Sequence, residues 1–139
     1  MTEPHLRDFP ARTYVGDRSQ VPMAQLAATI DAGFPKLFAR AGAPTGAPFI
    51  RYHGFEEILD IELGVPTAQG DRELPAGEYA TVTHFGPYEE LPAVHDTLRA
   101  WAKDQGLTLG DSIEVYETDP REEPDKAKWR TEVSYLVTP

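Results

Sequence analysis

The chain has 139 residues, and 23 Asp and Glu against 13 Lys and Arg give it a formal net charge of −10. This length suits one domain or two small halves that share a core, and the acidic charge disfavours direct contact with nucleic acid. The sequence has no cysteine, signal-peptide pattern or membrane-length apolar run, so we expect a cytoplasmic protein without disulfides, thiolate metal sites or a membrane partner.

Apolar residues recur every second position in predicted strands and every third or fourth position in predicted helices. In chain order the pattern predicts a tail over 1–10, strand 11–17, helix 22–41, strands 49–53 and 58–65, strand 77–85, helix 91–105, and strands 113–118 and 129–137. Gly42 and Gly106 stop the two helices. Gly33 and Pro35 interrupt the first helix, and we expect a kink or a local break at Pro35.

The same order of elements occurs twice, as strand, helix, glycine stop, strand and strand. Tyr52 follows the first glycine stop at the interval at which Tyr116 follows the second. An internal repeat of this kind sets the whole architecture. We therefore predict an α+β fold of two pseudo-symmetric β-α-β-β (SHS2-type) modules, about 11–66 and about 73–139. Two helices would cover one antiparallel sheet, with a ligand groove between the modules.

Sequence motifs for metal binding, phosphate binding or a serine nucleophile are missing, and no metal or cofactor is expected. The more informative pattern is carboxylates that alternate with aromatic residues along strands. If the helices cover the apolar face, we expect Glu62, Glu114, Tyr116 and Glu132 on the other face of the sheet, or where the sheet curves into a groove. A carboxylate beside aromatic rings suits a lipophilic cation, although an ordinary solvated sheet face would give the same pattern.

Seven stretches in this order and spacing resemble the GyrI-like small-molecule-binding domain, which also serves as the effector-binding module of AraC-type and MerR-type multidrug regulators of bacteria. They are Gly46–Tyr52, Leu59–Pro66, Leu74–Tyr79, His84–Tyr88, Leu98–Trp101, Glu114–Pro120 and Thr131–Glu132. The resemblance covers the chain from about Arg12 to Pro139. It implies two β-α-β-β modules and an aromatic ligand groove with a glutamate near its centre. With 139 residues, we expect no helix-turn-helix domain in addition.

The resemblance also implies the site residues. The pair Glu114 and Tyr116 matches the acidic and aromatic floor, and Glu132 matches the acidic position of the last strand. Either glutamate is a candidate for the central one. Aromatic positions at the groove are matched by Phe85 and Tyr88, and strand proximity alone adds Trp129 and Tyr52.

Three functions remain open at this stage. The first is binding of small amphipathic molecules, cationic or aromatic, with no chemical step. The second is hydrolysis of reactive electrophilic compounds, in which Glu114 or Glu132 activates water and Tyr116 orients or protonates the leaving group. The third is a protein-interaction role of the acidic surface, such as shielding a DNA-acting enzyme from inhibitors, which rests on analogy alone.

Overall fold

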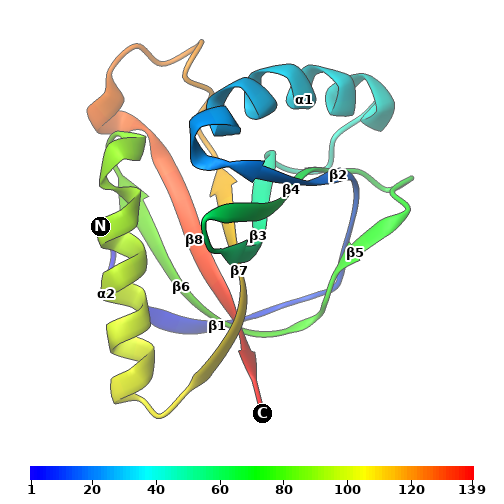
Figure 1. The fold of residues 1–139 in the computed structure, drawn as a ribbon. Coiled ribbons are helices and arrows are strands. Elements are labelled where there is room, and N and C mark those ends of the chain that lie inside the picture. Colours follow the sequence, from blue (N-terminus) through cyan, green and yellow to red (C-terminus); the bar gives the residue numbers. More distant parts are fainter. The chain divides into compact units, whose positions relative to one another are not determined.

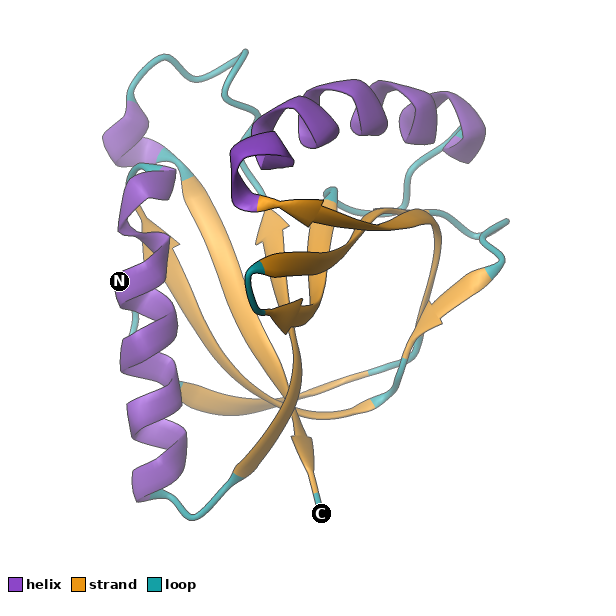
Figure 2. Cartoon of the chain, viewed as in Figure 1, coloured by secondary structure: helices purple, strands orange, loops and turns teal.

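The computed structural model describes all 139 residues, which form two compact units. Residues 10–76 form one unit, and residues 1–9 together with 77–139 form the other. Each unit contains one α-helix and four strands (Figure 2). We name them the α1 unit and the α2 unit after their helices.

The elements carry the labels of Figure 1. In the α1 unit they are β2 (Arg12–Pro22), α1 (Leu26–Ala41), β3 (Phe49–Phe55), β4 (Ile58–Pro66) and β5 (Arg72–Leu74). In the α2 unit they are β1 (His5–Phe9), β6 (Gly77–Phe85), α2 (Leu91–Asp104), β7 (Thr108–Tyr116) and β8 (Arg130–Thr138). Three short 3-10 turns, Met23–Gln25, Tyr88–Glu90 and Lys126–Lys128, complete the set. Neither helix is long and apolar enough to cross a membrane.

Both units have the same strand connectivity, as the repeat predicts. In the α1 unit the antiparallel order is β3-β4-β2-β5, and in the α2 unit it is β7-β8-β6-β1. The last strand of each β-α-β-β module therefore lies between the other two. One further strand then pairs with the free edge of the first, β5 on β2 and β1 on β6. This arrangement confirms the predicted α+β fold.

Several element boundaries differ from the sequence prediction. Residues 5–9, expected in a tail, form β1, and every residue of β1 is paired with β6. Strand β7 begins at Thr108 rather than at Ile113, because a register shift between Leu109 and Ser112 hides the alternation. Helix α1 continues through Pro35, so the local break expected there does not occur.

The α2 unit is stabilised by an apolar layer between α2 and its sheet. Helix α2 contacts β6 and β7 and buries Leu91, Val94 and Leu98 at helical spacing. These side chains pack against a second set from the strands, namely Ala80, Val82, Val133 and Tyr135, with Trp101 partly buried beside them. Full burial of each large aliphatic side chain contributes about 1.5–3 kcal/mol.

The α1 unit brings its helix close to the sheet through a glycine. A Cβ atom on Gly33 would lie 2.4 Å from Leu63 Cδ1, so α1 approaches β4 more closely than any other residue would permit. The same close contact shows that Leu63, which is 2% exposed, faces the helix. Strand alternation then places Glu62 on the face away from α1, as the sequence predicts.

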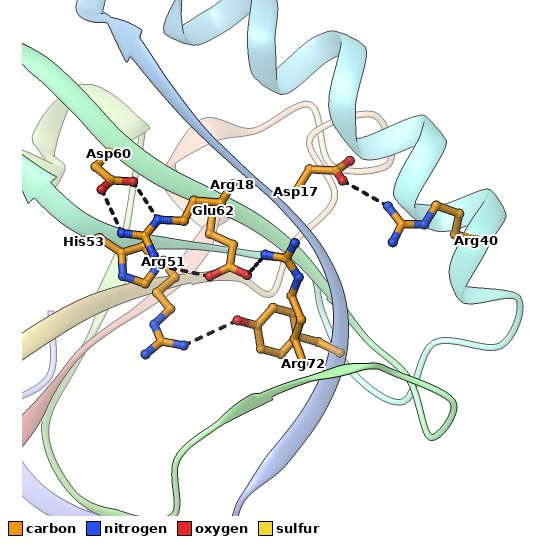
Figure 3. Close-up of polar contacts among 9 residues, drawn as sticks. Asp17, Arg18, Arg40, Arg51, His53, Asp60, Glu62 and Arg72 are labelled. Atoms are coloured by element: carbon orange, nitrogen blue, oxygen red, sulfur yellow. Dashed lines mark hydrogen bonds and ion pairs between the residues drawn. The ribbon is translucent and has the colours of Figure 1, made fainter.

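That second face of the α1 unit carries a buried carboxylate with several donors (Figure 3). Glu62 is 3% exposed and its oxygens lie 3.0 Å from His53 Nε2 and 2.5 Å from Arg72 Nη1. Burial raises the pKa of the Glu62 carboxyl, but hydrogen bonds from His53, Arg72 and Tyr14 lower it more, and the net pKa lies below the ordinary 4.5. The Glu62 charge is therefore part of what stabilises this sheet.

The close approach of α1 predicts the effect of Gly33→Ala. In an ordinary helix interior alanine is more stable than glycine by about 1 kcal/mol. Here the new Cβ would displace the buried Leu63, and overpacking costs about 1–3 kcal/mol. We expect a lower free energy of unfolding in urea. Gly46→Ala, whose Cβ would first meet an atom at 3.5 Å, is the control and should change little. Equal or higher stability of Gly33→Ala would contradict the packing argument.

The lowered pKa of Glu62 predicts a pH-dependent contribution to stability. A carboxyl whose native pKa is depressed stabilises the fold above its ordinary pKa, and this contribution disappears as pH falls below about 4.5 through the native value. Glu62→Gln should therefore lower the free energy of unfolding by about 2 kcal/mol at about pH 7 and by much less at about pH 3. Urea unfolding at the two pH values measures this difference. Asp60→Asn on the same strand breaks the more exposed pair with Arg18 and should cost less than about 1 kcal/mol. A Glu62→Gln penalty independent of pH would refute the linkage.

Candidate functional site

Glu114 lies on the helix-covered face of the α2 unit, not on the opposite face that the sequence predicts. In the register of β7 and β8, Glu114 is paired with Val133 and Tyr116 with Thr131, and directly opposite residues share a face. Val133 packs under α2, so Glu114 and Tyr116 also face α2. The prediction was wrong because both faces of this sheet bury side chains: Ile113, on the other face of β7, is 2% exposed. Polarity along the strand therefore could not identify the helix side.

Two short hydrogen bonds hold the Glu114 carboxylate in place. The Tyr116 hydroxyl donates to Oε1 at 2.6 Å, and His95 Nε2, which comes from α2, lies 2.6 Å from Oε2. Glu114 is only 6% exposed. A buried carboxylate is costly unless hydrogen bonds and charges compensate for the lost water. The contact with His95 therefore joins α2 to β7 at this point.

Three aromatic rings continue outward from this carboxylate. The Tyr116 ring packs edge-on against Tyr88, with centroids 5.6 Å apart. Tyr88 in turn packs against Trp129 at 4.9 Å. The Trp129 indole N–H donates to the Glu123 carbonyl at 2.8 Å, which fixes the orientation of the indole. We call Glu114, Tyr116, Tyr88 and Trp129 the aromatic–acid cluster.

Electrostatics around Tyr88 show the sign of the potential in the cluster. Burial raises the pKa of the Tyr88 phenol, and the negative charges of Asp119 and Glu114 raise it further. Burial opposes a charge of either sign, whereas the contribution of the two carboxylates gives the potential at the Tyr88 phenol a negative sign.

Glu132 lies on the opposite face of the same sheet from Glu114. It is paired with Val115 on β7 and Thr83 on β6, neither of which faces α2. The residue is 9% exposed, and its carboxylate lies 3.4 Å from Arg7 Nη1 of β1. The two candidate glutamates therefore do not share one site within the α2 unit.

The remaining candidates, Phe85 and Tyr52, are outside the aromatic–acid cluster. Phe85, at the end of β6, is 48% exposed and lines an open surface hollow with Met1, His84 and Glu90. Tyr52 lies on β3 of the α1 unit, where its ring stacks on Phe55 at 4.6 Å. The structure thus brings together four of the seven predicted binding residues.

His95 is the site residue that the sequence analysis missed. His95 belongs to none of the metal-binding sequence motifs and stands outside the stretches that carry the family resemblance. Its position carried another signal, because it follows Leu91 by four residues and precedes Leu98 by three, on the buried stripe of α2. A titratable residue on an apolar stripe needs a buried partner. No group of three or more His, Cys, Asp or Glu side chains in the structure is arranged to hold a metal ion.

Several solved structures share this fold. The C-terminal domain of EcmrR matches with a TM-score of 0.83 and 24% identity, over 98% of this chain and 97% of that chain. This chain spans 57% of the longer EcmrR chain that was solved in a complex with DNA. SAV2435 bound to tetraphenylphosphonium matches with a TM-score of 0.68 and 14% identity, over 99% and 94% of the two chains.

A hydrolase encoded by lin2189 from Listeria innocua also matches, with a TM-score of 0.73 and 12% identity over 98% and 92% of the two chains. At these identities the likeness establishes the fold. No curated protein matches this chain significantly. The model of the GyrI-like small molecule binding domain matches residues 2–137, and the chain therefore belongs to this family of small-molecule-binding domains.

Proposed function

We propose that the protein binds small lipophilic cations at the aromatic–acid cluster of the α2 unit. The observation that carries this proposal is a buried carboxylate, Glu114, followed by three aromatic rings in mutual contact. Each ring face in contact with a cation contributes about 0.5–2 kcal/mol. The carboxylate supplies a counter-charge that is stronger than in water because it is largely removed from solvent.

Three further observations support a cationic ligand over a neutral one. Burial is the main cause of the raised pKa of Tyr88, but the negative charges of Asp119 and Glu114 also raise it, so the potential at the cluster is negative. The chain as a whole carries a formal charge of −10, which raises the local concentration of cations near the surface. In addition, SAV2435, which has the same fold, was solved with tetraphenylphosphonium, a lipophilic cation. That molecule is a suitable probe for this chain.

The binding proposal predicts a specific loss in Glu114→Gln. Tetraphenylphosphonium should quench Trp129 fluorescence in Trp101→Phe, where Trp129 is the one remaining tryptophan. In this background Glu114→Gln should weaken binding about tenfold, which corresponds to about 1.4 kcal/mol. The neutral compound triphenylphosphine oxide should bind both variants equally, because it has no net charge to lose.

Glu132→Gln is the matched control, since it removes a buried carboxylate from the opposite face of the same sheet. We expect it to change the affinity for tetraphenylphosphonium less than about twofold. If Glu132→Gln weakens binding and Glu114→Gln does not, the ligand site lies on the other face. Absence of saturable binding in the parent protein would contradict the proposal altogether.

Hydrolysis of an electrophilic small molecule is the second candidate function. One observation favours it: the carboxylate of Glu114 has a hydroxyl on one oxygen and an imidazole on the other, at 2.6 Å each. Such a group can activate water as a general base, while Tyr116 donates a proton to the leaving group. The Listeria innocua hydrolase shares the fold.

This second candidate predicts turnover rather than capture. Incubation with a strained electrophile such as an aryl epoxide should release more than one equivalent of diol per protein, as measured by chromatography. Glu114→Gln should reduce the rate by 10²-fold or more, the order that a general base contributes. Glu132→Gln serves again as the control. Product that stops at one equivalent would exclude catalysis and leave binding as the function.

A further inference from the structure

A continuous line of hydrogen bonds runs from the surface of α2 to the Glu114 carboxylate. Arg99 Nη1 lies 2.9 Å from the Tyr135 hydroxyl, and this hydroxyl lies 2.6 Å from His95 Nδ1. The other ring nitrogen of His95 lies 2.6 Å from Glu114 Oε2. At its outer end Arg99 also forms an ion pair with Asp96. Four side chains from α2, β7 and β8 are thus connected in series.

The chemistry of the donors fixes the direction of every bond in this line. A guanidinium can only donate, so the Tyr135 oxygen accepts from Arg99. The single hydroxyl proton of Tyr135 is then left for His95 Nδ1. Ser112 is also buried and is paired with Tyr135 across the sheet. Its hydroxyl lies outside strict hydrogen-bond geometry, and its contact lowers the pKa of the Tyr135 phenol, which is the effect of a donor to the phenol oxygen and not of an acceptor. Because Nδ1 accepts, the ring proton of His95 is on Nε2 and is donated to Glu114.

This arrangement opposes the usual behaviour of a histidine beside a carboxylate. The charge of Glu114 favours a second proton on His95, which would convert the contact into an internal ion pair. A proton on Nδ1 would displace the Tyr135 hydroxyl proton and add a positive charge on the side of Arg99. Burial raises the pKa of the Tyr135 phenol above its ordinary value, which keeps that hydroxyl a donor. The Tyr116 hydroxyl meanwhile occupies the other oxygen of Glu114.

We propose that Tyr135 and Arg99 are positioning residues that hold His95 neutral, with its proton on Nε2, so that His95 orients Glu114 without neutralising it. The negative charge of the carboxylate then serves a ligand cation rather than an imidazolium. The last step rests on the proposed function, whereas the protonation state of His95 does not. The selectivity for cations would thus be set by two residues that do not touch the ligand.

The protonation state can be measured directly on the full chain by nitrogen-15 NMR of the histidine rings. At about pH 7 we expect the neutral Nε2–H form of His95. In Tyr135→Phe, which removes one hydroxyl, and in Arg99→Gln, a larger fraction of His95 should carry two protons at the same pH. Tyr79→Phe removes a tyrosine hydroxyl from the opposite face of the sheet and should leave His95 unchanged. A wild-type proton on Nδ1, or no difference between Tyr135→Phe and wild type, would overturn the proposal.

Binding of tetraphenylphosphonium then separates electrostatic positioning from a merely structural role. Tyr135→Phe should weaken binding about tenfold at about pH 6 and less than about twofold at about pH 8.5, because the lower proton concentration disfavours a second proton on the imidazole. An equal loss at both pH values would mean that the hydroxyl acts through structure, and would overturn the positioning role. If NMR gives the expected His95 states but Glu114→Gln binds the cation as well as wild type, the His95 inference stands and the proposed function fails.

Discussion

The burial of one carboxylate, Glu114, constrains the rest of the α2 unit. A side chain that is 6% exposed has lost nearly all of its water, and the structure must replace the lost hydrogen bonds. His95 supplies one from α2 and Tyr116 supplies another from β7 itself. His95 reaches Glu114 only at one position of α2 along the strands. The polar contact therefore fixes this position, whereas the apolar contacts alone would permit small shifts of the helix along the sheet.

The two units use the same connectivity for two different electrostatic purposes. In the α1 unit the buried Glu62 has the Arg72 guanidinium at 2.5 Å, and its pKa is lowered as a result of its hydrogen bonds. In the α2 unit a phenol and an imidazole donate to Glu114. The first arrangement suits a permanent ion pair that stabilises a sheet. The second orients a carboxylate with groups that can stay neutral, as the proposed binding of a cation would require.

The sequence predicted the architecture well because its signals were local or repeated. Alternation over Gly77–Phe85 and the stripe from Leu91 to Leu98 gave β6 and α2, and the repeat gave the shared connectivity. The chemistry of the site was harder to predict. Glu114 was assigned to the wrong face because the face of a strand that meets a helix depends on pairing register, here with Val133, and not on composition alone. Tyr88 and Trp129 were proposed and do meet, although they are distant in sequence.

His95 illustrates what a sequence pattern leaves out. Its neighbours at helical spacing, Leu91 and Leu98, indicate burial, but they do not say which group on the sheet receives its proton. That depends on Tyr135 and Glu114, which come from two different strands, and on Arg99, one helical turn away on α2. A histidine, a tyrosine and an arginine that are unremarkable as separate residues become one directional line because a guanidinium cannot accept a hydrogen bond. The charge state of a binding site can thus be decided at the far end of such a line, by a half-exposed arginine on the outer surface of the helix.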